Sequence, residues 1–135
     1  MKIKKIEPFV ICHELDHCFY FSQWRYDARK ICIVRITCED GTYGWGEGYG
    51  PAGLIFEGIR FFTPLLLEKD ALQQDVLWQQ MYLKSLDYAR RGIFLSALSA
   101  IDIALWDIKG KVLDQSVSIL LGGRKRDKVR AYATG

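Results

Sequence analysis

The chain has 135 residues, 50% of them hydrophobic, which is enough for one domain with one core but not for a separate catalytic domain as well. Its 19 Lys and Arg against 16 Asp and Glu leave a net charge of +3 with no long run of one sign, so no nucleic-acid partner is expected. No apolar run approaches the ~20 residues that cross a bilayer, and the start lacks the apolar segment of a secretory signal. We therefore expect a cytoplasmic protein with no membrane partner.

The cysteine pattern argues against both disulfides and zinc. The four cysteines are Cys12, Cys18, Cys32 and Cys38. They contain no C-x-x-C spacing and occur without an export signal, so free thiols are expected. Cys12-His13 and His17-Cys18 offer zinc ligands, but their spacing matches no zinc template and neighbours in a strand point to opposite faces. The sequence predicts no metal site in this chain.

The first half of the chain is strand-like. Residues 2–13, 30–39 and 42–49 are rich in Ile, Val, Phe, Tyr and Cys and predict three strands. Asp40-Gly41 supplies the positive-φ positions of a tight turn between the second and third, which predicts an antiparallel hairpin. Residues 14–29 show no clean period of 2 or 3.6 and predict a long loop, and long loops in compact domains are often functional.

The predicted third strand has an unusual composition. It alternates large side chains with Gly44, Gly46 and Gly48, so one of its faces is bare. We expect a backbone or a ligand to approach that face closely.

Helical patterns follow from about residue 52. They predict a helix over residues 54–67, bent or divided near Pro64, and a second over residues 72–86. The expected apolar face of the second helix is Leu72, Val76, Gln79, Leu83 and Leu86. A long third helix is predicted over residues 92–113. Its expected core stripe is Ala97, Ile101, Ala104, Leu105 and Ile108.

The order of strands and then helices indicates an α+β fold, a three-stranded antiparallel meander followed by a helical bundle on one face of the sheet. The third helix is apolar nearly all round, which one small sheet cannot cover. A short helical piece over residues 116–121 and an alternating strand over residues 128–135 end the sequence, and that strand has no visible partner. Both features predict a neighbouring domain that these residues do not include.

Two signatures carry a family resemblance. Residues 97–111 read ALSAIDIALWDIKGK and are followed by LLGG at residues 120–123. This stretch closely resembles the end of the capping domain of the mandelate racemase and muconate-lactonizing enzyme family, in the enolase superfamily. Residues 40–47, DGTYGWGE, and residues 129–133, VRAYA, resemble the family's sheet turn and first barrel strand. The resemblance covers essentially the whole chain and is greatest for galactarolactone cycloisomerases and related sugar-acid enzymes.

The resemblance implies a division of labour. Residues 1–123 would be an enolase-type N-terminal capping domain, and residues 124–135 a linker and the first strand of a (β/α) barrel. In the family the barrel supplies the base and the carboxylates that hold Mg²⁺, and the reaction removes a proton next to a carboxylate. The complete protein is therefore expected to be a Mg²⁺-dependent cycloisomerase, dehydratase or racemase of a sugar-derived acid, and this chain alone is expected to be inactive. Its expected partners are the barrel domain, a small carboxylate substrate and further copies in a homo-oligomer.

In the family the capping domain contributes two loops that close over the substrate, and here they correspond to residues 14–29 and 48–56. The candidate substrate-binding residues are His17, Gln23, Trp24, Arg25, Tyr26 and Tyr49, with Arg29 nearby. An arginine can bind a carboxylate with two parallel hydrogen bonds. The alternative for each residue is a solvated loop whose aromatic side chains pack on the barrel rim.

Other patterns in the sequence have simpler explanations. Gly48-x-Gly50-x-x-Gly53 matches a dinucleotide-binding fingerprint, but no second parallel strand follows it, so hinge glycines are expected. Asp102 and Asp107 lie about 140° apart on a helix and cannot form an acid and base pair. Asp107 is expected to pair with Lys111, and Glu47 is expected to be structural.

Two other functions remain open from the sequence. The chain could be a complete binding or oligomerisation module that pairs with a separately encoded barrel, or a nonfunctional remnant of a truncated gene. An aggregation-prone isolated domain that exposes the third helix would count against the binding module.

Overall fold

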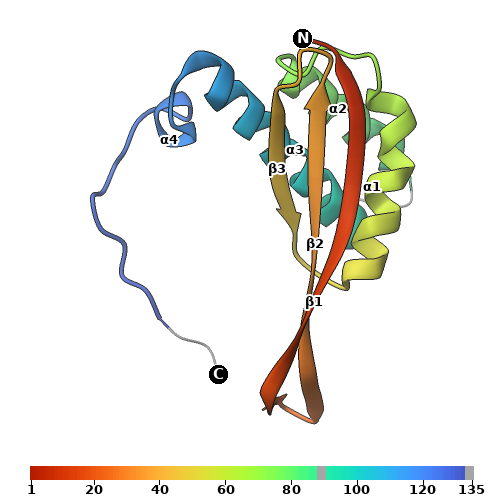
Figure 1. Cartoon of the computed structure of the whole chain (residues 1–135), viewed down its shortest axis with the longest axis vertical. Coiled ribbons are helices and arrows are strands. Elements are labelled where there is room, and N and C mark those ends of the chain that lie inside the picture. Colours follow the sequence, from red (N-terminus) through yellow and green to blue (C-terminus); the bar gives the residue numbers. More distant parts are fainter. Residues whose placement is uncertain (88–90, 133–135) are drawn as a thin grey trace.

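The computed structural model of the chain describes residues 1–87 and 91–132. Within them, three strands, β1 (Ile3–Phe21), β2 (Trp24–Cys38) and β3 (Tyr43–Gly48), precede four helices, α1 (Ala52–Leu66), α2 (Gln74–Ser85), α3 (Ile93–Leu113) and α4 (Val117–Leu120). The strands form one antiparallel meander in the order β1-β2-β3, with α1, α2 and α3 on one side of it (Figure 1). The predicted α+β fold is confirmed.

The core lies between the inner face of the sheet and the helices. Along β2, every second residue points inward, and Cys32, Val34, Ile36 and Cys38 are buried. On α3, the predicted core stripe is confirmed, because Ala97, Ile101, Ala104, Leu105 and Ile108 are all buried. Helix α1 covers the neighbouring part of the sheet with Ile55, Ile59, Phe62 and Leu66.

The bare face of β3 meets the backbone of α3. A Cβ atom on Gly44 would lie 2.1 Å from the carbonyl oxygen of Ala104, and one on Gly46 would lie 1.9 Å from that of Ala100. Neither distance leaves room for any side chain, since atoms that are not bonded attract best at about 3.5–4.0 Å. The close approach predicted from the glycines is therefore confirmed, and the approaching group is a helix backbone.

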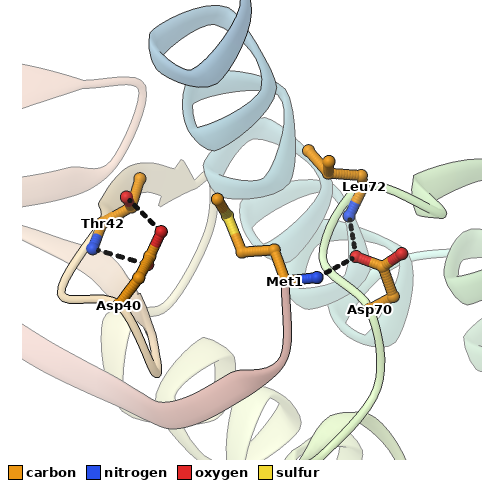
Figure 2. A network of polar contacts seen from close by, with 5 residues as sticks. All are labelled: Met1, Asp40, Thr42, Asp70 and Leu72. Atoms are coloured by element: carbon orange, nitrogen blue, oxygen red, sulfur yellow. Dashed lines mark hydrogen bonds and ion pairs between the residues drawn. The ribbon is translucent and has the colours of Figure 1, made fainter.

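The turn at Asp40-Gly41 is also confirmed. Gly41 has a φ of 88°, which a residue with a side chain rarely adopts. The Asp40 carboxylate accepts hydrogen bonds from the N–H of Thr42 at 3.0 Å and from its hydroxyl at 3.1 Å (Figure 2). These contacts fix the register of β2 and β3.

A second polar contact fastens the start of β1. The N-terminal ammonium of Met1 donates to Asp70 Oδ1 at 3.0 Å, and the N–H of Leu72 donates to the same oxygen at 3.1 Å (Figure 2). The pKa of Asp70 is lowered, first by the hydrogen bond from the ammonium and then by the one from Leu72. Both contacts favour the ionised carboxylate.

Two expectations about the first helices need correction. Helix α1 is not divided at Pro64 but continues to Leu66. Pro64 lacks the N–H that would bond to the carbonyl of Arg60, but only two helical residues follow it, so no second helical segment results. The predicted apolar face of α2 is wrong, since Val76 and Leu83 are exposed. The residues that α2 buries are Gln74, Leu77, Met81 and Ser85. Apolar residues occur on several sides of this helix, so its periodicity does not select a face and its packing against α3 does.

The end of the chain also differs from the prediction. Residues 128–132 are exposed and form no strand, and residues 133–135 lie outside the described part. A strand needs a neighbour for its backbone hydrogen bonds, and no other strand lies beside this segment in the described residues. Among those residues, no helix has the length and apolar character needed to cross a membrane.

Candidate functional site

Residues 14–29 were predicted as a loop, and this prediction is wrong: they form the outer part of the β1–β2 hairpin. Glu14 pairs with Ala28, and Phe21 pairs with Trp24 across the two-residue turn Ser22-Gln23. We call residues 14–29 the arm. The strand pattern is hidden in the sequence because four residues of β1, 15–18, lie opposite a single residue of β2, so the alternation changes phase there.

The arm leaves the rest of the molecule at the end of β3. Gly48 pairs with Cys32 in the last row of the β2–β3 ladder, and beyond this row β1 and β2 continue as a two-stranded ribbon. Figure 1 shows this ribbon twisting and projecting past the ends of the helices. An isolated two-stranded hairpin is marginally stable in water. The arm is thus a protruding element without a core of its own.

One face of the arm tip is aromatic. Directly paired residues of two strands share a face, as do alternate residues of one strand, so this face carries Phe19, Phe21, Trp24 and Tyr26. The rings of Phe19 and Tyr26 stack with their centroids 4.9 Å apart. The guanidinium of Arg29 lies 3.9 Å from the centroid of the Phe19 ring. We call these four aromatic residues the aromatic face.

The opposite face of the tip is polar and carries Cys18, Tyr20, Arg25 and Asp27. Arg25 Nε donates to Asp27 Oδ1 at 2.7 Å. This hydrogen bond, and then the charge of Asp27, raises the pKa of Arg25. The hydroxyl of Tyr20, which pairs with Arg25 across the strands, lies 3.9 Å from Cys18 Sγ. We call these four residues the polar face.

The fold of this chain occurs in known proteins. Residues 5–122 match the family described as mandelate racemase / muconate lactonizing enzyme, N-terminal domain. The chain belongs to this family. Its resemblance to the galactarolactone cycloisomerases is confirmed by a 45% identity over 135 residues to the D-galactarolactone cycloisomerase of Agrobacterium fabrum, covering 100% of this chain and 36% of that protein.

Solved structures of the enolase superfamily share the fold. The 3,6-anhydro-D-galactonate cycloisomerase from Zobellia galactanivorans is 62% identical with a TM-score of 0.84, over 93% of this chain and 33% of that one. L-Talarate dehydratase from Polaromonas sp. JS666, complexed with Mg and L-glucarate, is 25% identical with a TM-score of 0.84, over 96% of this chain and 37% of that one. The chain thus spans about a third of the length of these relatives.

In this family member the five predicted substrate contacts of the arm are distributed over four places. Trp24 and Tyr26 lie together on the aromatic face, whereas Arg25 lies on the polar face. His17 belongs to the residues of β1 that have no directly paired partner, and Gln23 is in the turn. Phe19, Phe21 and Asp27 share these two faces but were not among the predicted contacts. Their signal is the alternation of aromatic and polar residues on both sides of Ser22-Gln23.

The second predicted loop, residues 48–56, is shorter than expected. β3 ends at Gly48 and α1 begins at Ala52, so residues 49–51 alone connect them. Tyr49 on this link is 92% exposed. The link lies beside the base of the arm, at the same end of the sheet (Figure 1).

The expected pair of Asp107 and Lys111 is confirmed and has a wider role. Lys111 Nζ lies 2.8 Å from Asp107 Oδ2, and that oxygen also accepts the N–H of Trp45 at 2.9 Å. Lys111 Nζ donates to the carbonyl of Tyr43 at 2.8 Å. The pair therefore satisfies backbone groups on the free edge of β3, which would otherwise be open to another strand.

Asp102 takes no part in this arrangement. It is half-buried on α3, and its pKa is raised first by burial and then by the charge of Asp75. Asp107 is committed to Trp45 and Lys111, so the two aspartates form no acid and base pair. The glycine fingerprint beginning at Gly48 also lacks its context, because β3 belongs to an antiparallel meander.

The described residues contain no group of side chains that could hold the metal ion of the family. Across residues 1–87 and 91–132, no group of three or more His, Cys, Asp and Glu side chains is placed to hold a metal ion. The four cysteines are free thiols. The magnesium present with the Polaromonas relative therefore finds no fitting group of ligands among the described residues.

Proposed function

We propose that this chain is the substrate-capping and specificity domain of a magnesium-dependent enzyme that isomerises or dehydrates a sugar-derived acid. The observation that carries the proposal is the arm, a projecting ribbon whose tip exposes Phe21 and Trp24 to 66% and 63%. A ribbon without a core is suited to closing against another surface, and lids of this kind exclude water and orient substrates.

A second apolar surface supports a docked domain at the other end of the chain. Apolar side chains are exposed on α3, on α4 and directly after α4: Ile103, Val112, Leu113, Ile119 and Leu121. Exposed apolar side chains in this segment, after which the relatives continue for most of their length, favour contact with another domain. The partner in this proposal is the barrel domain of the same protein.

The division of chemistry follows from the residues that are present. In the proposed enzyme the barrel holds the magnesium, which supplies charge stabilisation when a proton leaves the carbon next to the substrate carboxylate. The arm and the link with Tyr49 would hold the distal part of the substrate and exclude water. Candidate contacts in the arm are His17, Gln23, Trp24, Arg25 and Tyr26.

A chimera tests this proposal. The chain replaces the matching third of the Agrobacterium D-galactarolactone cycloisomerase, whose barrel is retained. In a variant, Asn-Gly replaces residues 15–27 and joins Glu14 to Ala28, which face each other across the hairpin and suit a two-residue turn. We expect kcat/KM for the lactone to fall by about 100-fold or more, because a misplaced substrate loses rate on this scale.

The thermal unfolding midpoint of each protein serves as the control for folding. A shortened chimera that is folded and as active as the parent chimera would disprove the capping role of the arm. A folded chimera that binds no sugar acid at all would count against the assignment of the chain to this class of enzyme.

A further inference from the structure

We infer that the polar face of the arm selects substrates whose distal end is a neutral, hydroxylated ring and rejects a second carboxylate there. The Arg25–Asp27 ion pair is the specificity-determining element. This inference rests on the proposed function and concerns what the cap recognises.

The charges of Arg25 and Asp27 on the polar face cancel each other. Arg25 is the cationic side chain among the four residues that define the polar face, and its Nε already binds Asp27 Oδ1 at 2.7 Å. The side chains of Arg25 and Asp27 remain 60% and 66% exposed, so a ligand can reach both. Exposed ion pairs of this kind contribute about 0–1 kcal/mol to stability. The main consequence of the Arg25–Asp27 pair is thus that this part of the polar face carries no net charge.

The remaining charges of the arm act in the same direction. Arg29 alternates with Arg25 and Asp27 along β2, but its guanidinium lies 3.9 Å from the centroid of the ring of Phe19, a residue of the aromatic face. Over residues 14–29, three carboxylates oppose two guanidinium groups. A ligand carboxylate at the polar face would meet an arginine that is already neutralised and would be repelled by Asp27.

The polar face also presents hydrogen-bond donors and acceptors to a ligand. A guanidinium carries five N–H donors, and the bond to Asp27 leaves most of those of Arg25 free. The second oxygen of Asp27 is an acceptor, and the hydroxyl of Tyr20 on the same face can donate or accept. Donors and acceptors side by side match the hydroxyl and ether groups of a sugar ring.

The names of the two cycloisomerase relatives describe substrates of this type. A galactarolactone has one of its two carboxyl groups closed into a ring, and a 3,6-anhydrogalactonate has a single carboxylate and an ether ring. In each, the remaining carboxylate is next to the carbon that would lose its proton, and the distal end is neutral. The 25% identical talarate dehydratase was instead crystallised with L-glucarate, which carries a carboxylate at both ends.

The test compares two ligands that differ at one end. Galactonate and galactarate share a carbon skeleton, but galactarate has a second carboxylate where galactonate has a hydroxymethyl group. Their Kd values are measured by calorimetry on the chimera with Mg²⁺. We expect galactonate to bind more tightly, and Asp27→Asn to shift the ratio of the two Kd values about tenfold toward galactarate, because it releases the charge of Arg25.

Two further variants separate charge from structure. The double variant Arg25→Gln with Asp27→Asn removes both charges and should restore the parent ratio. Glu68→Gln removes a carboxylate of the exposed Lys2–Glu68 pair, far from the arm, and should leave the ratio unchanged. This control matches Asp27→Asn in its change of net charge.

Each outcome decides between the two proposals. If Asp27→Asn leaves the ratio unchanged while the shortened arm weakens both ligands, the inference is overturned and the capping role stands. If the shortened arm changes neither Kd, the capping role fails and the inference fails with it. A ratio that shifts equally with Glu68→Gln would reveal an effect of overall charge and would also overturn the inference.

Discussion

The arm and the body of this protein, by which we mean the described residues outside residues 14–29, use the same strands in opposite ways. In the body, β2 buries Val34 and Ile36 against helices. In the arm, the same strand exposes Trp24 and Arg25 on opposite faces of a ribbon that no helix covers. One continuous strand, β2, is therefore packed against helices in the body and is uncovered in the arm.

This difference indicates where the free energy of folding resides. Burial of apolar area contributes about 25 cal/mol per Å², and in the body that area lies between the sheet and the helices. The arm tip has paired strands and one aromatic stack, but its apolar atoms remain largely in water. Anything that binds the ordered arm and not its frayed form stabilises the arm, so we expect a bound partner to increase its order.

The largest expected effect is on thiol reactivity, which compares the packed part of the body with the exposed strand that leads into the arm. Cys32 and Cys38 are buried in the body, and burial is the main cause that raises the pKa of both thiols. Cys12 is exposed beside the arm. We expect alkylation of Cys12 to be about a thousandfold faster, because the buried thiols react only after the body opens. Pulsed alkylation with mass spectrometry measures the rates, and similar rates at Cys12 and Cys32 would contradict the packed body.

The next largest effect concerns the contact between the backbones of β3 and α3 in the body. Gly46→Ala places a Cβ 1.9 Å from the Ala100 carbonyl oxygen, and we expect the free energy of unfolding to fall by about 3 kcal/mol, the upper part of the range for overpacking. Gly53→Ala is the matched control, because nothing lies within 4 Å of its Cβ and it is inside α1. It should be neutral or stabilise by up to about 1 kcal/mol. Urea denaturation measures both, and a Gly46→Ala variant as stable as Gly53→Ala would show that β3 and α3 can separate without cost.

The same contrast explains what the sequence could predict. The strands of the body, the Asp40-Gly41 turn and the glycine face of β3 follow from local patterns that fold without reference to distant residues. The arm was predicted as a loop because residues 15–18 shift the phase of β1, and cross-strand register is not visible in one strand alone.

For the candidate site residues, the sequence predicts which segment carries them but not the direction in which their side chains point. Trp24 and Arg25 belong to the expected segment, yet their opposite faces depend on the pairing across Ser22-Gln23. The hydrogen bond from Trp45 to Asp107 joins residues 62 positions apart, so it could not be read from spacing. In α2, apolar residues on several sides left the choice of face to α3.

A smaller effect is expected at the free edge of β3. Asp107→Ala removes the acceptor of the Trp45 N–H and the partner of Lys111, and should cost about 1–2 kcal/mol, less than a buried charged hydrogen bond because both side chains are partly exposed. In a double-mutant cycle with Lys111→Met, the coupling energy should be about 1 kcal/mol. Glu57→Ala on the exposed Glu57–Arg60 pair of α1 is the control and should cost less than about 0.5 kcal/mol. Equal losses for Asp107→Ala and Glu57→Ala would mean that the edge of β3 needs no cap.

The smallest effect concerns the end of β1 opposite the arm, where Asp70 binds the ammonium of Met1. The pKa of Asp70 is lower in the folded protein, so its contribution is present above the unfolded pKa of about 3.9 and is lost as the pH falls through the folded value. Asp70→Asn should therefore lower the free energy of unfolding at neutral pH by less than about 1 kcal/mol, since the side chain is partly exposed. The difference between variant and parent should close in acid, as measured by urea denaturation at a series of pH values. A difference that persists unchanged in acid would mean that the asparagine disturbs the turn at Leu72, and that charge does not anchor this end of β1.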